Sequence, residues 1–497
     1  MTNLTLIDWL VCGGYLAAVF GLGLWFSGKQ TDNEAFFVGS RRMHWVPIGL
    51  SVFAGMFSAL SYVGLPSEGA YGDWHTFLGI MFIPLVACPI VGWLFVPLYH
   101  RVGQVSGYAY LERRFHRAVR LAASLLYIGY ATCWMGNMLV AVGVILQVTL
   151  GVTHAQTGWL LLGVGAFATL YTTMGGVKAV IWTDVLQAFA LGGGMLLILL
   201  MTVGRIDGGW TGLWDTAVRY DKFAMFDMTF DVQRENFISA CAFGFFVYVA
   251  GYAIQFKEAQ RYVSMPDVAS ARRALAVNGV MIAVVCFIFF LVGTAMFAYY
   301  HHALPEGAAA GSGFPPQVKK PDQLLPYFVT HVLTVPGLVG VLVAGLFAAA
   351  MSSVDSGINA LTASVVYDWL AGRQITVRVS RLLCTLFGAG AVAVALVLHQ
   401  WQFNVFDMVI GISGAWLGGL LGVFLLGMLV RRATTGGAVI GLVTAGACLA
   451  AVMYWNLMFG WWYSAVTCLP TFAIGWAASY LFAPPRREQV ENGLVIV

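Results

Sequence analysis

Long apolar stretches alternate with short polar segments along the whole chain, and this pattern predicts the fold class. A helix of about 20 apolar residues is long enough to span a hydrocarbon core of about 30 Å. Stretches of that kind recur from one end of the chain to the other. The sequence therefore predicts an all-α polytopic membrane protein with about 13 transmembrane helices, at 6–28, 44–70, 74–99, 118–150, 154–174, 178–203, 236–256, 274–300, 334–366, 379–399, 404–430, 435–455 and 460–482.

Two of these spans carry small and polar residues where a membrane helix is normally apolar. The second contains Ala54 to Ala59 and then Ser61, and the seventh contains Ala242-Phe243-Gly244 and then Ala250-Gly251. The two spans lie five spans apart, which fits an inverted repeat whose halves each open with a broken helix. Freed carbonyl groups at such breaks can coordinate Na⁺. Small residues also let intact helices pack closely, so a packing role stays open.

The repeat predicts how the chain is divided. Its two halves are flanked by one extra N-terminal helix and two extra C-terminal helices. The expected segments are 1–43 with the extra helix and a cytoplasmic loop, 44–203 as the first repeat, 204–232 as an extracellular loop, 233–430 as the second repeat, and 431–497 with two helices and a short cytoplasmic tail.

Composition supports the membrane assignment and argues against a soluble domain. Hydrophobic residues make up 60% of the chain and charged residues 10%, against about 25% charged in soluble domains. The first stretch lacks a preceding basic residue and a small-residue cleavage site, so we expect a retained helix and not a signal peptide. The eight cysteines fall inside or at the edges of apolar stretches, where they behave as small hydrophobes.

Basic residues predict the orientation, because Lys and Arg remain in cytoplasmic loops. With the N-terminus outside and the C-terminus in the cytoplasm, 20 of the 26 basic residues fall in cytoplasmic segments. This supports a multi-pass protein of the cell inner (plasma) membrane. It also accounts for the net charge of +4 without a nucleic-acid partner.

Two carboxylates are predicted to lie inside spans, where a charge is costly and usually functional. Asp184 lies about six residues, or roughly 9 Å, from the inner end of its helix, and Asp355 about eleven residues, or roughly 16 Å. Both therefore occupy the inner half of the membrane, and they face one another if their helices are neighbours.

The ninth span combines its carboxylate with hydroxyl groups. Ala349, Ser352, Ser353 and Ser356 recur at helical spacing, with Asp355 beside them, so they share one stripe. Hydroxyl, carboxylate and carbonyl oxygens are hard ligands that suit an alkali cation. A small-residue packing seam has the same spacing. Asp355 favours the ion site, because a packing seam has no use for a carboxylate.

Three further polar residues inside spans have two interpretations each. Asn137 needs a hydrogen bond, so it either contacts a solute or ties helices together. Tyr248 and Tyr252 either bind a solute or belong to an aromatic core. The histidines form no cluster inside the spans, and we find no nucleophile–base pair there, so the sequence does not predict an enzyme.

Several motifs, spread in order from residue 30 to about 430, resemble those of the sodium/solute symporter family. They are Gly175-Gly176-Val177-Lys178-Ala179-Val180-Ile181-Trp182-Thr183-Asp184-Val185-Leu186-Gln187, Gly64-Leu65-Pro66-Ser67-Glu68, Tyr110-Leu111-Glu112-Arg113-Arg114-Phe115, Gln260-Arg261-Tyr262 and Ser352-Ser353-Val354-Asp355-Ser356-Gly357-Ile358-Asn359-Ala360. The resemblance implies a LeuT-like 5+5 inverted repeat and alternating access.

The resemblance also implies binding sites. It implies a sodium site made by the carbonyl groups of Ala54, Phe57 and Ala349 and the hydroxyls of Ser352 and Ser353. It implies a second cation site, for Na⁺ or a proton, at Asp184, Ser352, Asp355 and Ser356. It places the substrate between the broken helices, near Ser58, Ser61, Met81, Asn137, Tyr248 and Tyr252.

The chain departs from the family pattern at two positions. Asp355 stands where a serine is usual, and Asn137 falls where the sialic-acid transporters have an arginine. We therefore expect Na⁺-coupled symport of a small organic solute into the cytoplasm, with a monocarboxylate or similar anion favoured and a sugar or amino acid as alternatives. We expect a monomer to be sufficient. The rival hypothesis is a transporter-like sensor for the same solutes that does not transport.

Overall fold

The computed structural model describes residues 4–27, 32–302, 313–401, 411, 413–491 and 493–496, and within them every regular element is helical. The start of the predicted span 404–430 lies outside the described residues. The helices are α1 Leu6–Ser27, α2 Asn33–Val38, α3 Trp45–Met56, α4 Ala59–Tyr71, α5 His75–Met81, α6 Ile83–Val102, α7 Ala109–Arg114, α8 Arg117–Leu150, α9 His154–Val203, α10 Trp210–Arg219, α11 Phe237–Ile254, α12 Phe256–Val263, α13 Val268–His301, α14 Leu324–Phe328, α15 Leu338–Ser364, α16 Val377–Trp401, α18 Gly419–Leu429, α19 Thr435–Tyr454, α20 Tyr463–Ala478 and α21 Arg487–Val490.

Ten of the described helices or joined helices are long and apolar enough to cross a membrane, and the bent pair α3–α4 brings the number to 11. The longest of them, α9, has 50 residues. At 1.5 Å per residue it measures about 75 Å, more than twice a bilayer core. It is interrupted at Gly176, where φ is 60° and ψ is −162°. The break falls between the predicted spans 154–174 and 178–203. The count of 13 spans and the inverted repeat remain predictions.

The second span is broken, as predicted. α3 ends at Met56, α4 begins at Ala59, and their axes differ by 71°. Phe57 between them has an extended backbone, with φ of −83° and ψ of 123°. Ser58 caps α4 by accepting a hydrogen bond from the Ser61 N–H at 3.2 Å. The break therefore leaves carbonyl groups at the end of α3 without partners inside the helix.

The predicted break within 242–251 of the seventh span is wrong. α11 runs without interruption to Ile254, and the chain turns at Gln255 before α12. Gly244 and Gly251 instead allow close packing, since a Cβ atom would lie 2.2 Å from the Gly79 carbonyl oxygen and 2.7 Å from the Met56 methyl carbon, respectively. The small residues serve helix contact, the alternative that the sequence left open.

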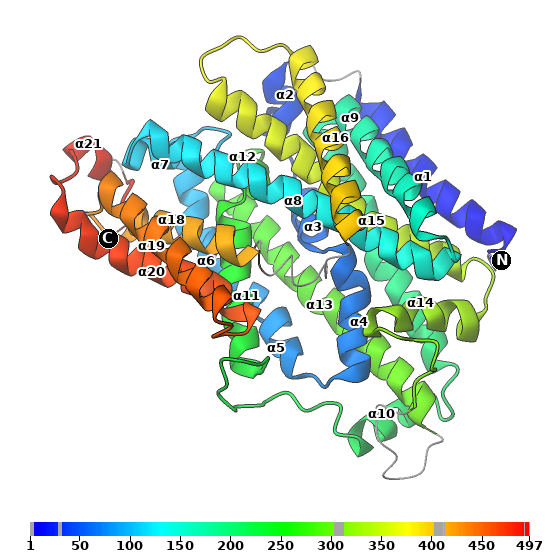
Figure 1. Ribbon diagram of the computed structural model, residues 1–497. Coiled ribbons are helices and arrows are strands. Elements are labelled where there is room, and N and C mark those ends of the chain that lie inside the picture. The colour runs from blue at the N-terminus through cyan, green and yellow to red at the C-terminus, as the bar shows by residue number, and fades with distance from the viewer. Residues whose placement is uncertain are drawn as a thin grey trace.

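The helix α15 lies at the centre of the arrangement. Nearly all of its 27 residues are buried, whereas of the 22 residues of α1 the buried ones are Asp8, Cys12, Tyr15, Val19 and Gly23. It packs against α1, α3, α8, α9 and α16. Figure 1 shows α1 and α9 at one side of the molecule and α18, α19 and α20 at the other. Residues on α15 are therefore enclosed on several sides by other spans.

Candidate functional site

The helix α15 meets the break of the second span through Ser352. The Ser352 hydroxyl lies 2.9 Å from the carbonyl oxygen of Ala54 and 3.2 Å from that of Ala349. Three of the five oxygen atoms of the predicted sodium site are thus in contact. The two helices that carry them pack against each other, and the site lies inside the protein.

The hydroxyl of Ser353 faces the same interior. Its side chain is 2% exposed, and its oxygen has no hydrogen-bond partner among the described residues. A buried hydroxyl without a partner is rare and usually marks a site for an ion or water. Phe57 is the residue at the turn, so its carbonyl group is not part of a helix ladder. The donor set of hydroxyls and carbonyls suits a hard cation such as Na⁺.

Asp184 on α9 is buried and forms an ion pair with Arg261. Its Oδ2 atom accepts hydrogen bonds from Ser51 at 2.5 Å and from Arg261 at 2.9 Å. The same guanidinium nitrogen of Arg261 donates to the Ser356 hydroxyl at 2.7 Å. Arg261 therefore joins Asp184 on α9 to Ser356 on α15, and it lies between two of the predicted second-site ligands.

Asp355 accepts hydrogen bonds from neutral donors. Its Oδ2 atom accepts from Tyr171 at 2.6 Å, with Thr183 at 3.4 Å, and its Oδ1 atom accepts from the Ser356 N–H at 2.5 Å. The residue is fully buried. Asp184 and Asp355 therefore lie in one region, as predicted, but only Asp184 is ion-paired.

Three charged residues of α12 complete this cluster, and the sequence analysis assigned them no role there. Lys257 and Arg261 are among the basic residues that the charge bias assigns to the cytoplasmic side, and both are buried on α12. Arg261 forms an ion pair with Glu258 at 2.8 Å, and the Lys257 ammonium lies 3.8 Å from the same carboxylate. A charged run of eight residues between two spans resembles a loop. The segment Phe256–Val263 contains no Gly or Pro, and this feature of the sequence could have indicated a helix.

These cations also reach the broken span. The Lys257 ammonium donates to the Gly55 carbonyl oxygen at 2.5 Å. A Cβ atom at Gly55 would lie 2.9 Å from both terminal nitrogens of Arg261, so only glycine leaves room for the guanidinium. Gly55 directly follows Ala54, so the charged cluster lies next to the sodium-site residues.

The predicted substrate residues come from four helices, α4, α5, α8 and α11. The hydroxyls of Ser58 and Ser61 lie 3.0 Å apart at the start of α4. The rings of Tyr248 and Tyr252 stack at 5.9 Å with an angle of 18° between them. Met81 and Asn137 are both buried, at the end of α5 and within α8. Whether these groups line one substrate site stays a prediction.

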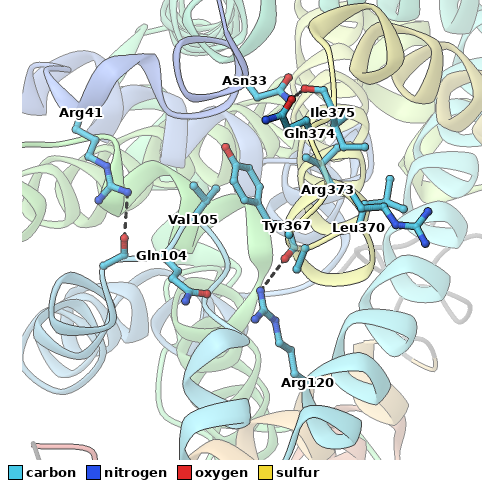
Figure 2. A pocket seen from close by; sticks show the side chains of 14 residues that line it. Asn33, Arg41, Gln104, Val105, Arg120, Tyr367, Leu370, Arg373, Gln374 and Ile375 are labelled. Atoms are coloured by element: carbon cyan, nitrogen blue, oxygen red, sulfur yellow. Dashed lines mark hydrogen bonds between the residues drawn. The ribbon is translucent and has the colours of Figure 1, made fainter.

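A cavity of about 650 Å³ lies elsewhere, among segments that the charge bias assigns to the cytoplasm. Figure 2 shows it between Arg41, Gln104 and Arg120 on one side and Tyr367 with the 370–375 loop on the other. Arg41 donates to the Gly103 carbonyl oxygen at 3.0 Å, and Arg120 to that of Tyr367 at 2.8 Å. None of the candidate ion and solute residues is among those that line this cavity.

Comparison with known proteins gives one family and a consistent group of relatives. The model of the sodium:solute symporter family matches residues 36–445. The sodium/sialic acid symporter of Proteus mirabilis is 28% identical over 98% of this chain and 97% of its own length. The human sodium/iodide cotransporter is 31% identical over 87% of this chain and 67% of its own length. A zebrafish sodium-coupled monocarboxylate transporter is 30% identical over 88% of this chain and 70% of its own length.

Solved structures agree with this group. A Na⁺-coupled sialic acid symporter in a substrate-bound outward-open state superposes with a TM-score of 0.85 and 25% identity, over 97% of this chain and 99% of that one. The nucleobase-cation symporter Mhp1 superposes with a TM-score of 0.51 at 13% identity, over 93% and 99% of the chains, and this likeness concerns the fold alone.

Proposed function

The chain belongs to the sodium:solute symporter family and uses Na⁺ as its coupling ion, and on this premise we propose that it carries a small organic anion into the cytoplasm. The relatives above are named for sialic acid, monocarboxylates and iodide. All three are anions at neutral pH. We favour a monocarboxylate or a similar small anion, with a sugar or an amino acid as alternatives.

The start of α4 supports an anionic solute. A helix N-terminus presents free N–H groups and a partial positive charge, and broken membrane helices use this end to hold carboxylates. Here the Ser58 and Ser61 hydroxyls lie beside that end. In the proposed site they bind the anionic group, while Met81, Asn137, Tyr248 and Tyr252 contact the remainder of the solute. Asn137 in place of an arginine favours a solute smaller than sialic acid.

The contact between Ser352 and Ala54 carries the proposal for coupling. Na⁺ bound by Ala54, Phe57, Ala349, Ser352 and Ser353 ties α15 to the broken span. The solute binds at the other side of the same break. Each ligand therefore raises the affinity of the other by the same factor. The membrane potential adds about 2.3 kcal/mol per charge per 100 mV, which drives uptake.

A second cation is proposed at Asp184, Asp355 and Ser356, with Ser352 as a shared ligand. Asp184 is paired with Arg261, and a second buried carboxylate beside it is costly to ionise unless a further cation or a proton neutralises it. The second cation is Na⁺ or a proton. The number of Na⁺ ions carried per solute, measured at several pH values, distinguishes the two.

We also propose the remaining features of the transporter. The protein lies in the cell inner membrane with its N-terminus outside and its C-terminus in the cytoplasm, divided at the boundaries given by the sequence. It acts as a monomer in lipid and has no nucleic-acid partner. The relatives named above are transporters, which argues against a sensor that does not transport.

A screen of purified protein identifies the solute. Thermal unfolding is measured with monocarboxylates, sialic acid, iodide, vitamins, sugars and amino acids, each in NaCl and in choline chloride. We expect stabilisation by a small anion only in NaCl, and accumulation of that anion in vesicles with an inward Na⁺ gradient. Binding without accumulation would instead support the sensor hypothesis. Stabilisation that is equal in both salts would contradict sodium coupling.

A further inference from the structure

A second cavity, of about 360 Å³, lies at the ends of α6 and α13 that the charge bias assigns to the cytoplasm. It is lined by α6, by the first turns of α13 and by the segment 493–496. Sites for small ligands usually have volumes of about 300–1,000 Å³, so this cavity has room for a small chemical group. None of the candidate ion and solute residues lines it.

Two arginines supply the positive charge of this second cavity, Arg101 from α6 and Arg272 from α13. Arg272 donates through Nε to the Gly92 carbonyl oxygen at 2.9 Å, and Arg101 donates through Nη1 to the Gly493 carbonyl oxygen at 3.2 Å. Within the part of the chain that the structure describes, no carboxylate oxygen lies within 4 Å of either guanidinium group. Each arginine therefore keeps terminal N–H donors for an anion.

Two arginines that line the first cavity have a different environment. Arg120 forms ion pairs with Glu112 at 2.6 Å and with Asp368 at 2.7 Å, and Arg41 forms one with Glu34 at 3.1 Å. The positive charges of these two arginines are therefore balanced by carboxylates of the protein. The second cavity has two guanidinium groups without such a partner among the described residues, so its field attracts an anion.

The protein holds both guanidinium groups of the second cavity in place. The Arg272 Cζ atom lies 4.0 Å from the centre of the Trp93 ring, which is a cation–π contact. Gly493 has a φ of 71°, and a Cβ atom there would lie 2.7 Å from Arg101 Nη1. Glycine is the residue that suits both this backbone conformation and this close approach. The two groups are thus positioned by neighbouring residues.

The remaining wall of the second cavity is apolar. It includes Trp93, Leu94, Pro97, Leu98, Val268 and Val495. Trp93 is 68% exposed on a helix long and apolar enough to cross a membrane, and tryptophan on such helices prefers the boundary between hydrocarbon and headgroups. Arg101 follows it by eight residues on α6, or about 12 Å. The cavity therefore joins a surface that faces lipid to a pair of guanidinium groups.

We propose that the second cavity binds the phosphate-bearing headgroup of an anionic phospholipid of the cytoplasmic leaflet, whose acyl chains lie along α6 beside Trp93. Arg101 and Arg272 donate to the phosphate oxygens, since the guanidinium fork matches phosphate geometry. Basic pockets between membrane helices on the cytoplasmic side suit such headgroups. The bound lipid connects α6, α13 and the segment 493–496. This proposal goes beyond sodium symport and takes from it only the orientation of the chain.

The apolar wall favours a lipid over a free phosphate ion. Both offer the same oxygen atoms to Arg101 and Arg272. A free phosphate ion has no apolar part, so it leaves Trp93, Pro97 and Val268 without a contact. A phospholipid covers these side chains and also gains the hydrophobic free energy of that contact.

Lipid binding to the purified protein in detergent tests this proposal without knowledge of the solute. Native mass spectrometry should show tighter binding of phosphatidylglycerol than of zwitterionic phosphatidylcholine. Arg101→Gln and Arg272→Gln should each weaken phosphatidylglycerol binding about tenfold, because each removes a charge-assisted hydrogen bond. The control is Arg273→Gln, which removes the same charge from an exposed neighbour that does not line the cavity and should bind as the unchanged protein does.

Three results would overturn the proposal. The first is equal affinity of the unchanged protein for phosphatidylglycerol and phosphatidylcholine. The second is an equal loss in Arg273→Gln and Arg272→Gln, which would show a general attraction to the basic inner surface. The third is displacement of phosphatidylglycerol by an equal concentration of inorganic phosphate, which would make the free ion the ligand. The first and third need no variant, so they decide even if neither cavity substitution folds.

Discussion

The Ser352 hydroxyl lies 2.9 Å from the carbonyl oxygen of Ala54, so the centre of α15 is joined directly to the break in the second span. The two residues are 298 positions apart in the chain. In the proposed mechanism, an ion bound at this contact would hold the two helices together and its release would free them. Alternating access in this family of folds requires such relative movement of helices.

The ion pair between Arg261 and Asp184 is expected to stabilise the fold. Removing one partner leaves a buried charge, at a cost of about 3–5 kcal/mol. Arg261→Gln takes this cation from both Asp184 and Glu258 and should lower the thermal unfolding midpoint strongly. Asp184→Asn leaves Arg261 paired with Glu258 and should lower it less, and the double variant should recover part of the loss caused by Arg261→Gln. The exposed pair of Arg41 and Glu34, 3.1 Å apart, serves as control and should show a coupling of about 0–1 kcal/mol. If double-mutant cycles give equal coupling energies for the buried pair and the exposed pair, the stabilising role of the buried pair is contradicted.

Close packing between α4 and α13 depends on Gly293. A Cβ atom there would lie 2.0 Å from the Pro66 carbonyl oxygen. Gly293→Ala should therefore cost about 1–3 kcal/mol through displacement of the two helices. Gly64 on α4 has nothing within 4 Å of its Cβ position, so Gly64→Ala is the matched control and should leave the unfolding midpoint unchanged or slightly raised. Similar losses of stability in both variants would show that the loss does not come from the contact between Gly293 and Pro66.

Arg114 is expected to contribute more to the stability of the fold than its neighbour Arg113, because it holds the end of α18. Its fully buried guanidinium donates to four carbonyl oxygens, those of Gly427, Val430, Arg431 and Ala433. Lysine has no fork of donors and cannot reproduce this arrangement. Arg114→Lys should lower the unfolding midpoint clearly, whereas Arg113→Lys, which changes a single bond to Val102, should have little effect. Equal unfolding midpoints of Arg114→Lys and Arg113→Lys would contradict this role of Arg114.

Lys222 gives a prediction for alkaline pH. Burial lowers the pKa of its amine to about 8, although Asp73 and Glu68 act in the opposite direction. The amine donates to the carbonyl oxygens of Ala70 and Gly72 at the end of α4. In the unfolded chain the pKa is about 10.4, so between these values the unfolded state binds more protons and stability rises with pH.

Lys222→Met removes the titrating amine of Lys222. Thermal unfolding of both proteins is therefore measured from pH 7 to pH 10. The stability of the unchanged protein relative to the variant should increase above about pH 8. A difference that stays constant over this range would show that the amine is not titrating in the folded protein.

Local sequence patterns predicted the broken second span and the hydroxyl-bearing helix that meets it, because the residues of each pattern lie close together in the chain. Ala54 to Ser61 and Ala349 to Ser356 each carry their pattern within about two helical turns. The role of Arg261 could not be found in this way. Its partners Asp184 and Ser356 are 77 and 95 residues away, and charged residues near a span end normally lie in a loop.

The seventh span shows a second reason why the sequence could not predict the structure. Gly244 and Gly251 suit both a break and a close helix contact, and the sequence contains no feature that separates these two uses. Their neighbours Gly79 and Met56, which decide the matter, come from α5 and α3. The turn at Gln255 instead lies where α11 meets the charged helix α12.

The central claim is that Na⁺ binds where α15 meets the break, with Ser353 as a ligand. It is tested most directly by binding of radioactive ²²Na⁺ to purified protein and to Ser353→Ala, with Ser364→Ala on the same helix as control. Loss of a contact to a charged ion, worth about 1.5–3 kcal/mol, should raise the sodium dissociation constant about tenfold or more in Ser353→Ala. Ser364→Ala should bind Na⁺ as the unchanged protein does. Unchanged sodium affinity in folded Ser353→Ala would contradict the site.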